Sequence, residues 1–187
     1  MQLARKKFLE EMKKYGVKKN IPNVSANVGN FLHSLAKMLG VQKILEIGTA
    51  NGYSTIWLAD AICKQKNARL LGLEISAPSY KKALENIVAQ GLEKIVEIKF
   101  GNALEILPTL TEQFDLIFVD AQKALYADFW KLCKPLMRPN CVVVFDDVLK
   151  FPEKTKTLHA QMQREKNYQK IILPTDGDDG ILVVRQK

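Results

Sequence analysis

The spacing of hydrophobic residues changes near residue 40 of the chain. Before that point apolar side chains recur every three or four residues, which predicts two amphipathic helices at residues 2–15 and 25–39. Residues 16–22 are expected to break the first helix, and Gly40 is placed to cap the second. The apolar positions are Leu3, Phe8, Leu9 and Met12 in the first helix and Val28, Phe31, Leu32, Leu35 and Met38 in the second.

Beyond residue 42, short apolar runs alternate with helical segments. The runs predict strands at residues 43–47, 69–73, 96–100, 114–119, 141–145, 168–173 and 181–185. Helices are predicted at residues 53–63, 78–90, 103–110, 125–136 and 153–165. This alternation predicts an α/β fold with a mostly parallel sheet and helices on both faces. The turn-forming segment 174–180 leaves no room for a helix, so the last strand should be antiparallel.

Length and composition favour one domain with one core, because the chain has 187 residues and 47% of them are hydrophobic. No apolar run reaches the roughly 18 to 20 residues of a membrane span, and the charged start lacks the apolar stretch of a signal peptide. We expect a cytoplasmic protein with no membrane partner, folded as a single domain 1–187 with a helical cap at 1–40 and a core at 41–187.

Charge and cysteine content restrict the possible functions only weakly. The formal net charge is +8, with much of the excess near the two ends. Such an excess can attract an anionic partner such as RNA, although it is more often a solvated surface. The cysteines Cys63, Cys133 and Cys141 form no CxxC pair and are expected to be buried thiols. The sequence leaves a homodimer open.

Ligand chemistry is expected where the strands end, because open α/β sheets bind ligands at the carboxyl ends of their strands. The first strand leads into a glycine-rich turn within the segment KILEIGTANGYSTIWLA, residues 43–59. Gly48 permits a tight turn and close approach of a ligand, and Gly52 opens a helix whose free N–H groups favour an anionic group. The GxxxG spacing differs from the GxGxxG of dinucleotide sites. The turn alone therefore predicts only a nucleotide-like site.

Polar residues also follow the next two strands. Glu74 can accept hydrogen bonds from both hydroxyls of a ribose, the alternative being a plain surface glutamate. Asn102 and Ala103 are placed to touch an adenine edge.

Three aspartates, Asp120, Asp146 and Asp147, follow the fourth and fifth strands and should converge. Their carboxylates would repel one another unless a cation lay between them, and Mg²⁺ favours all-oxygen sites of this kind. The alternative is that one or two of them cap helices or turns. Lys123 lies three residues after Asp120 and can face the same pocket. A lysine near a metal can have a lowered pKa and act as a general base.

Together these motifs resemble the cation-dependent O-methyltransferases, which are related to catechol O-methyltransferase, caffeoyl-CoA O-methyltransferase and many short bacterial relatives. The resemblance covers residues 23–185 and rests on the segments LEIGTANGYS, GLEIS, GNALEILP, FDLIFVDAQKALY, VVVFDDVL and DGDDGILVVRQ. It implies a Rossmann-like class I methyltransferase fold with a seven-stranded sheet, and S-adenosylmethionine (SAM) as cofactor. It also implies a divalent cation, with Mg²⁺ expected and Mn²⁺ or Ca²⁺ as alternatives.

The resemblance assigns roles to individual residues. It implies cofactor binding by Asn23, Val24, Glu46, Gly48, Gly52, Tyr53, Ser54, Glu74, Ile75, Asn102, Ala103 and Asp120. It implies metal ligation by Asp120, Asp146 and Asp147, and catalysis by Lys123 and Asp120.

The chain departs from the family pattern in four places. Where the family usually has Asp-Asn, this chain has Asp146-Asp147, and the extra carboxylate should tighten cation binding or change the preferred ion. Many relatives have Asp in place of Asn102, whose amide can still meet an adenine edge. Leu182 occupies the place of an acidic residue that catechol-specific members use. The N-terminal segment, which often helps form the substrate entrance or a dimer contact, is shorter than in most relatives.

We therefore expect an O-methyltransferase that acts on a hydroxyl of a catechol-like or caffeoyl-like small molecule. The alternative acceptor is a hydroxylated tRNA base, which the basic ends motivate. A non-catalytic cofactor-binding or scaffold protein is the alternative from another class, and Lys123 with the three aspartates argues against it. The glycine spacing disfavours a nicotinamide oxidoreductase.

Overall fold

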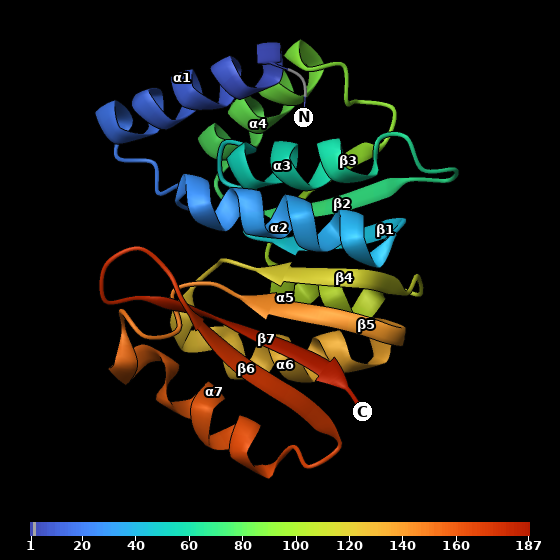
Figure 1. Cartoon of the computed structure of the whole chain (residues 1–187), viewed down its shortest axis with the longest axis vertical. Helices are drawn as coiled ribbons and strands as arrows, with labels where there is room; N and C mark the ends of the chain where they lie inside the picture. The colour runs from blue at the N-terminus through green and yellow to red at the C-terminus, as the bar shows by residue number, and fades with distance from the viewer. Residues whose placement is uncertain (2) are drawn as a thin grey trace.

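The computed structural model of the chain describes residues 1 and 3–187 (Figure 1). Within them one sheet has seven strands: β1 (Lys43–Ile47), β2 (Arg69–Glu74), β3 (Val96–Phe100), β4 (Phe114–Val119), β5 (Met137–Phe145), β6 (Tyr168–Pro174) and β7 (Gly180–Gln186). Their spatial order is β3-β2-β1-β4-β5-β7-β6. β7 pairs antiparallel with both of its neighbours, whereas the other pairs are parallel. The predicted mostly parallel sheet with a reversed last strand is confirmed.

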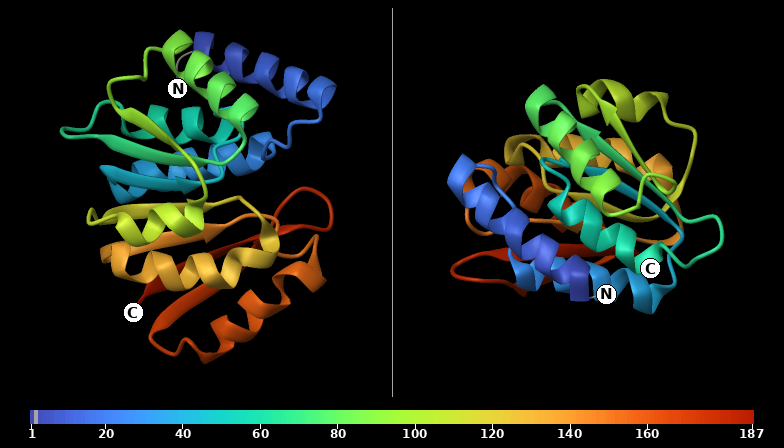
Figure 2. Two further views of the ribbon diagram at one scale, coloured as in Figure 1. Left: turned by 180° about the vertical axis from the view of Figure 1, so that it is seen from behind. Right: turned by 90° about the horizontal axis from the view of Figure 1, so that it is seen from above.

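Helices cover both faces of this sheet (Figures 1 and 2). One face carries α1 (Leu3–Lys19), α2 (Ala26–Leu39), α3 (Tyr53–Ile62) and α4 (Ala77–Ala89). The other carries α5 (Ala103–Ile106), α6 (Tyr126–Cys133) and α7 (Pro152–Arg164). Short 3₁₀ turns flank α5 and α6, namely η1 (Leu107–Thr109), η2 (Lys123–Leu125) and η3 (Lys134–Leu136). None of the helices in the described residues is long and apolar enough to cross a membrane.

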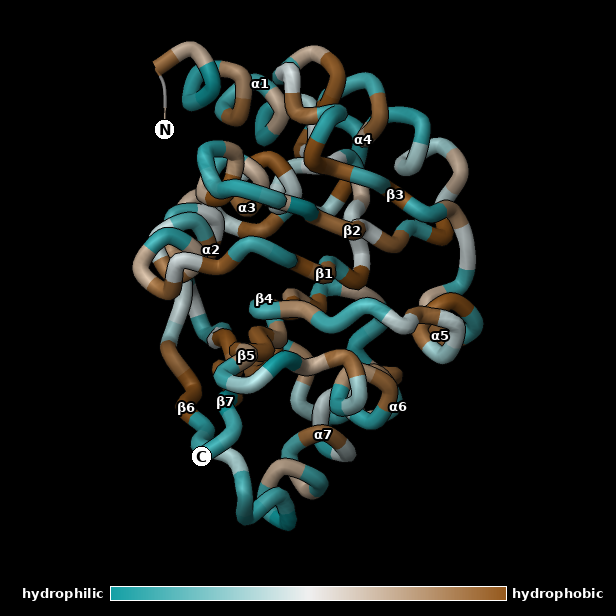
Figure 3. The backbone as a smooth tube through the Cα atoms, turned by 90° about the vertical axis from the view of Figure 1, so that its right-hand side faces the viewer, coloured by the Kyte–Doolittle hydropathy of each residue, from teal (hydrophilic) through white to brown (hydrophobic). Residues whose placement is uncertain are grey.

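Two hydrophobic cores result from the alternation of side chains along the central strands. Ile44 and Leu116 pack on the side of α2 and α3, whereas their neighbours Leu45 and Ile117 pack on the side of α6. Successive side chains of a strand point to opposite faces, so the side chains of a strand buried on both faces are mostly apolar. α4 and α7 each bury one face, and Figure 3 shows hydrophobic and hydrophilic residues alternating along them. α3 is buried over nearly its whole length.

The first helix differs from the prediction at its end. α1 continues through Gly16 to Lys19, so the predicted break at residue 16 is wrong. Asn20 ends the helix in the left-handed conformation (φ 53°), and the Ile21 N–H donates to the Gly16 carbonyl at 2.9 Å. The predicted start at Gln2 lies outside the described residues. The cap at Gly40 is confirmed by its φ of 62°.

Several predicted burials are also wrong. Leu3 and Met38 are 71% and 78% exposed, because each lies at the end of its helix beyond the buried stripe. Cys63 follows the last turn of α3 and is exposed, whereas Cys133 and Cys141 are buried thiols as expected.

Glu46 is a buried acid on β1, among otherwise apolar neighbours. Its carboxylate oxygens accept hydrogen bonds from the hydroxyls of Ser54, at 2.6 Å, and Thr55, both on α3. Burial raises the pKa of Glu46 to about 8, although the two hydroxyl hydrogen bonds lower it. These bonds tie β1 to α3 and hold the glycine turn between them.

We predict that the Glu46→Gln variant gains stability relative to the wild type as the pH rises. The pKa of Glu46 is about 8 in the folded state against an ordinary value of 4.5, so the unfolded chain releases its proton first. Between these pH values the free energy of unfolding should fall by about 1.4 kcal/mol per pH unit in the wild type because of this group, and not in the variant.

Urea denaturation between about pH 5 and about pH 8 measures this difference. Glu85→Gln is the control, because Glu85 lies exposed on α4 and its ion pair with Lys82 is also exposed to solvent. Parallel stability curves for Glu46→Gln and the wild type would show that Glu46 does not titrate in this range.

Candidate active site

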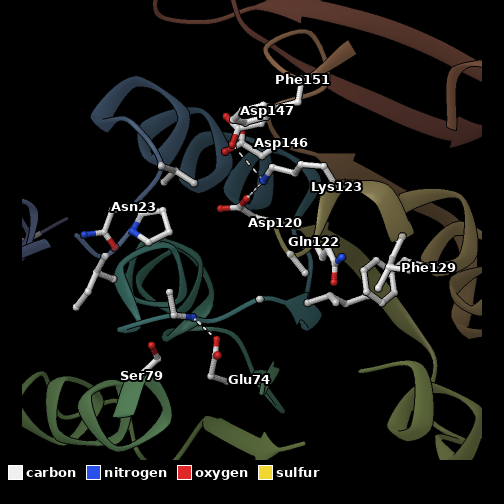
Figure 4. Close-up of a pocket in the computed structure, with 18 of the residues that line it drawn as sticks. Asn23, Glu74, Ser79, Asp120, Gln122, Lys123, Phe129, Asp146, Asp147 and Phe151 are labelled. Atoms are coloured by element: carbon white, nitrogen blue, oxygen red, sulfur yellow. Dashed lines mark hydrogen bonds and ion pairs between the residues drawn. The ribbon is translucent and has the colours of Figure 1, made fainter. Parts of the chain in front are cut away.

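A cavity of about 1000 Å³ opens at the carboxyl ends of the parallel strands. Gly48, Glu74, Asp120 and Asp146 line it, and they follow or end β1, β2, β4 and β5. Figure 4 shows Glu74 and Ser79 on one side of this cavity and the three aspartates with Lys123 on the other. The site therefore lies where the fold class predicts it.

The glycine turn is shaped by the protein's own backbone as well as by space for a ligand. A Cβ on Gly48, whose φ is 94°, would lie 2.2 Å from the carbonyl oxygen of Asp120. The Gly48 N–H also donates to the Leu73 carbonyl at 3.0 Å. Gly48 thus lets the ends of β1, β2 and β4 meet. Gly52 has ordinary space around it, but its φ of 86° at the start of α3 favours glycine.

Glu74 is held with its carboxylate at the cavity. One carboxylate oxygen accepts from the Ala50 N–H and the other from the Ser76 N–H, both at 2.7 Å. Each oxygen keeps a free lone pair, so the group can still accept from a pair of hydroxyls. This fits the predicted contact with a ribose.

The residues with an implied cofactor role divide into two groups. Those that line the cavity are Asn23, Val24, Gly48, Glu74, Ile75, Asn102, Ala103 and Asp120. Within the described residues, those that do not line the cavity are Glu46, Gly52, Tyr53 and Ser54. A direct contact of the second group with a cofactor stays a prediction.

Asn102 already uses its amide within the protein. Its side-chain oxygen accepts from the Leu104 N–H at 3.0 Å and its nitrogen donates to Glu105 at 3.0 Å, which caps α5. An adenine edge would therefore compete with the cap for this amide.

The side-chain amide of Asn23, unlike that of Asn102, is unpartnered in the described residues. Both polar atoms of its amide are buried and find no hydrogen-bond partner in the described part of the chain. A buried amide without partners is costly, and its nitrogen packs against Gly16 of α1.

The three aspartates converge as predicted. Asp120, Asp146 and Asp147 each offer a carboxylate oxygen, and these oxygens lie within 4.8 Å of one another. Burial, together with the charges of Asp120 and Asp147, raises the pKa of Asp146 to about 8. Burial also raises the pKa of Asp147. A cation between these oxygens would relieve their repulsion, and oxygen donors suit a hard divalent ion, so the residues fit a metal.

Lys123 projects from η2 into this cluster. Its ammonium lies 2.5 Å from Asp120 and 3.1 Å from Asp147. Burial lowers the pKa of Lys123, but the two ion pairs outweigh burial and raise it above its usual range. The lowered pKa expected for Lys123 depended on the charge of a nearby cation. Among the protein's own groups, the carboxylates of Asp120 and Asp147 dominate, and the pKa of Lys123 is raised instead.

Asp179, on the β6–β7 loop, is an acidic residue of the site that the sequence did not single out. It shares a hydrogen bond with the Asp147 side chain. It also accepts from the N–H groups of Lys150 and Gly180, at 3.1 and 2.7 Å. Leu182, by contrast, is buried in the core. The signal in the sequence is the acidic run DGDDG, residues 176–180, which both forms the turn and contributes to the family resemblance.

Basic residues also reach the cavity unexpectedly. Lys13 of α1 lines it and donates to the carbonyls of Asn23 and Val24 at 2.7 and 2.8 Å. At the rim, the ammonium groups of Lys150 and Lys154 lie 5.6 and 4.9 Å from the ring centre of Phe151. Nothing in the sequence pattern distinguished these lysines from other surface lysines.

Solved structures share this fold. The structure of the O-methyltransferase from Bacillus cereus in complex with SAH has a TM-score of 0.88 and 30% identity, covering 97% of this chain and 91% of that one. The O-methyltransferase TomG from Streptomyces achromogenes, in complex with SAM, has a TM-score of 0.88 and 30% identity, covering 96% and 89%.

Curated proteins are similar over about two thirds of the chain. The catechol O-methyltransferase of Niastella koreensis is 42% identical over 132 residues, which are 68% of this chain and 59% of that protein. Caffeoyl-CoA O-methyltransferase 2 of Populus trichocarpa is 33% identical over 136 residues, which are 70% and 54%. The matches thus span less than two thirds of the relatives' length. The O-methyltransferase family profile matches residues 2–182, and the chain belongs to that family.

Proposed function

We propose that the protein is a SAM-dependent, divalent-metal-dependent O-methyltransferase that methylates a hydroxyl of a catechol-like or caffeoyl-like small molecule. The observation that carries the proposal is the position of Lys123 and the three aspartates in the same cavity as the glycine turn and Glu74. Relatives named for catechol and caffeoyl-CoA, and neighbours in complex with SAM or SAH, support it.

The cofactor would span the cavity from Glu74 toward the aspartates. Glu74 would accept from the ribose hydroxyls, and the backbone turn at Gly48 would pass beside the nucleoside. Asn23 and Val24 line the cavity and would border the amino-acid arm. Residues that fix the cofactor in this way would remove much of the entropic barrier to methyl transfer.

Asp120, Asp146 and Asp147 would hold the divalent ion. When bound, the ion would act as a Lewis acid that lowers the pKa of an acceptor hydroxyl. It would also offset the carboxylate charge that keeps the pKa of Lys123 high, and Lys123 could then take the hydroxyl proton. Asp179 shares a hydrogen bond with the Asp147 side chain and accepts from the Lys150 N–H in the segment that follows, and so holds this carboxylate in place.

A hydroxylated tRNA base is the second candidate acceptor. Lys150 and Lys154 flank Phe151 at the cavity rim, and this combination of cationic and aromatic side chains suits a phosphate next to a base. The net charge of +8 favours the same partner.

Replacement of Lys123 by Met should lower kcat for catechol methylation by roughly 100- to 1000-fold, because the proton acceptor is lost. Affinity for S-adenosylhomocysteine (SAH) should change little, since Lys123 contacts aspartates and not the turn. Steady-state kinetics and calorimetry measure the two effects. Lys131→Met on the exposed face of α6 is the control, and wild-type turnover in Lys123→Met would exclude Lys123 as the base.

Replacement of Asp147 by Asn should weaken Mg²⁺ binding by about tenfold or more. The variant removes one of the facing charges, and a unit charge a few ångströms away is worth on the order of 1 to 4 kcal/mol. Titration calorimetry with Mg²⁺ measures this directly, with Asp128→Asn on exposed α6 as the control. Equal affinity in Asp147→Asn would show that the charge of Asp147 does not contribute to Mg²⁺ binding, since an asparagine oxygen can still ligate the ion.

The salt dependence of activity should distinguish the two acceptors. Methylation of catechol should change by less than about twofold between low and moderate KCl, whereas activity on tRNA should fall steeply as counterions compete. A panel of small diols and hydroxylated tRNA, assayed across KCl concentrations, tests this. Efficient, salt-sensitive methylation of tRNA with inert diols would make the second candidate the acceptor.

A further inference from the structure

We propose that α1 is part of the cofactor site, with Lys13 and Gly16 as positioning residues for the segment 23–24 that receives the amino-acid arm of the cofactor. The inference rests on the proposed function, because it assumes that SAM and SAH occupy the cavity. It adds that a helix outside the strand-and-turn motif determines affinity for one part of the cofactor.

The position of the arm follows from the two ends of the cavity. Glu74 offers its free lone pairs to a ribose, and the reactive methyl must lie near Lys123. The amino-acid arm then extends toward the wall formed by the α1–α2 connection, where Asn23 borders the cavity (Figure 4). Asn23 and Val24 both line the cavity on this wall, so the segment 23–24 borders the space into which the arm would extend.

Lys13 holds this segment through its backbone. Its ammonium donates to the consecutive carbonyls of Asn23 and Val24, at 2.7 and 2.8 Å, and lies 5.7 Å from the centre of the Tyr53 ring. It also places a positive charge at the cavity wall, opposite in sign to the carboxylate of the arm. Burial lowers the pKa of Lys13, in keeping with its position inside this wall.

Gly16 leaves room for the side chain of Asn23 because it has no Cβ. A Cβ at Gly16 would lie 2.3 Å from the amide nitrogen of Asn23 and 3.1 Å from the Ile21 carbonyl oxygen. The amide end of Asn23 would have to move away from any larger residue. This contact also explains a glycine within α1, where it is otherwise unfavourable.

Two ligands separate this role from a general effect on the fold. SAH contains the amino-acid arm, whereas 5′-methylthioadenosine keeps the nucleoside and the sulfur and lacks the arm. Lys13→Met and Gly16→Ala should each weaken SAH by roughly tenfold and change 5′-methylthioadenosine by less than about twofold. Lys13→Arg should restore part of the SAH affinity, since it keeps the charge and the donors.

Titration calorimetry on the full chain measures both ligands. Lys14→Met is the matched control, because Lys14 is the next residue of α1 and lies exposed. If Lys13→Met weakens both ligands equally, or neither, the inference is overturned while the proposed function stands. If the wild type binds neither ligand, both the proposed function and the inference fail.

Discussion

Mutual repulsion among three neighbouring carboxylates, of which Asp146 is buried and the other two are partly buried, is the constraint on which the functional end of this molecule depends. Parallel strands deliver Asp120 and Asp146 to one edge of the sheet, and Asp147 follows directly. Burial and the neighbouring charges raise the pKa of Asp146 to about 8, and Lys123 offsets part of the negative charge. Such an arrangement by itself destabilises the folded protein, and a bound cation would compensate the repulsion.

The neighbouring loops keep these groups in place. Asp179, on the β6–β7 loop, accepts N–H bonds from Leu149 and Lys150 of the segment after β5, at 3.3 and 3.1 Å, so the two loops cannot separate without breaking these bonds. The Tyr126 hydroxyl donates to the Asp146 carbonyl at 2.9 Å and ties η2 and α6 to the same edge. At the opposite side of the cavity, Glu46 and Glu74 fix the glycine turn through hydroxyl and N–H donors. Hydrogen bonds within the protein thus hold the side chains at both ends of the cavity, and both ends carry carboxylates.

The sequence predicted most of the sheet because the signals there are local. An apolar run such as FDLIFV, bounded by polar residues, has the length and composition of a buried strand, and β4 has the predicted bounds. The convergence of Asp120 and Asp146 followed from one rule about strand ends. The residues that went unnoticed act across long sequence separations. Lys13, Asp179 and Gly16 have no local pattern that differs from a surface lysine, a turn aspartate or a helix breaker. Asn102 was placed correctly, but its role in capping α5 depends on Leu104 and Glu105.

Methyl transfer from labelled SAM to catechol, with Mg²⁺ and then with EDTA in excess, tests the central claim most directly. The account predicts a labelled methyl group on a hydroxyl oxygen, loss of transfer with EDTA, and recovery when Mg²⁺ is restored, because Asp120, Asp146 and Asp147 form the only cluster of three metal-ligating side chains in the described residues. Transfer that is undiminished by chelation would contradict the account.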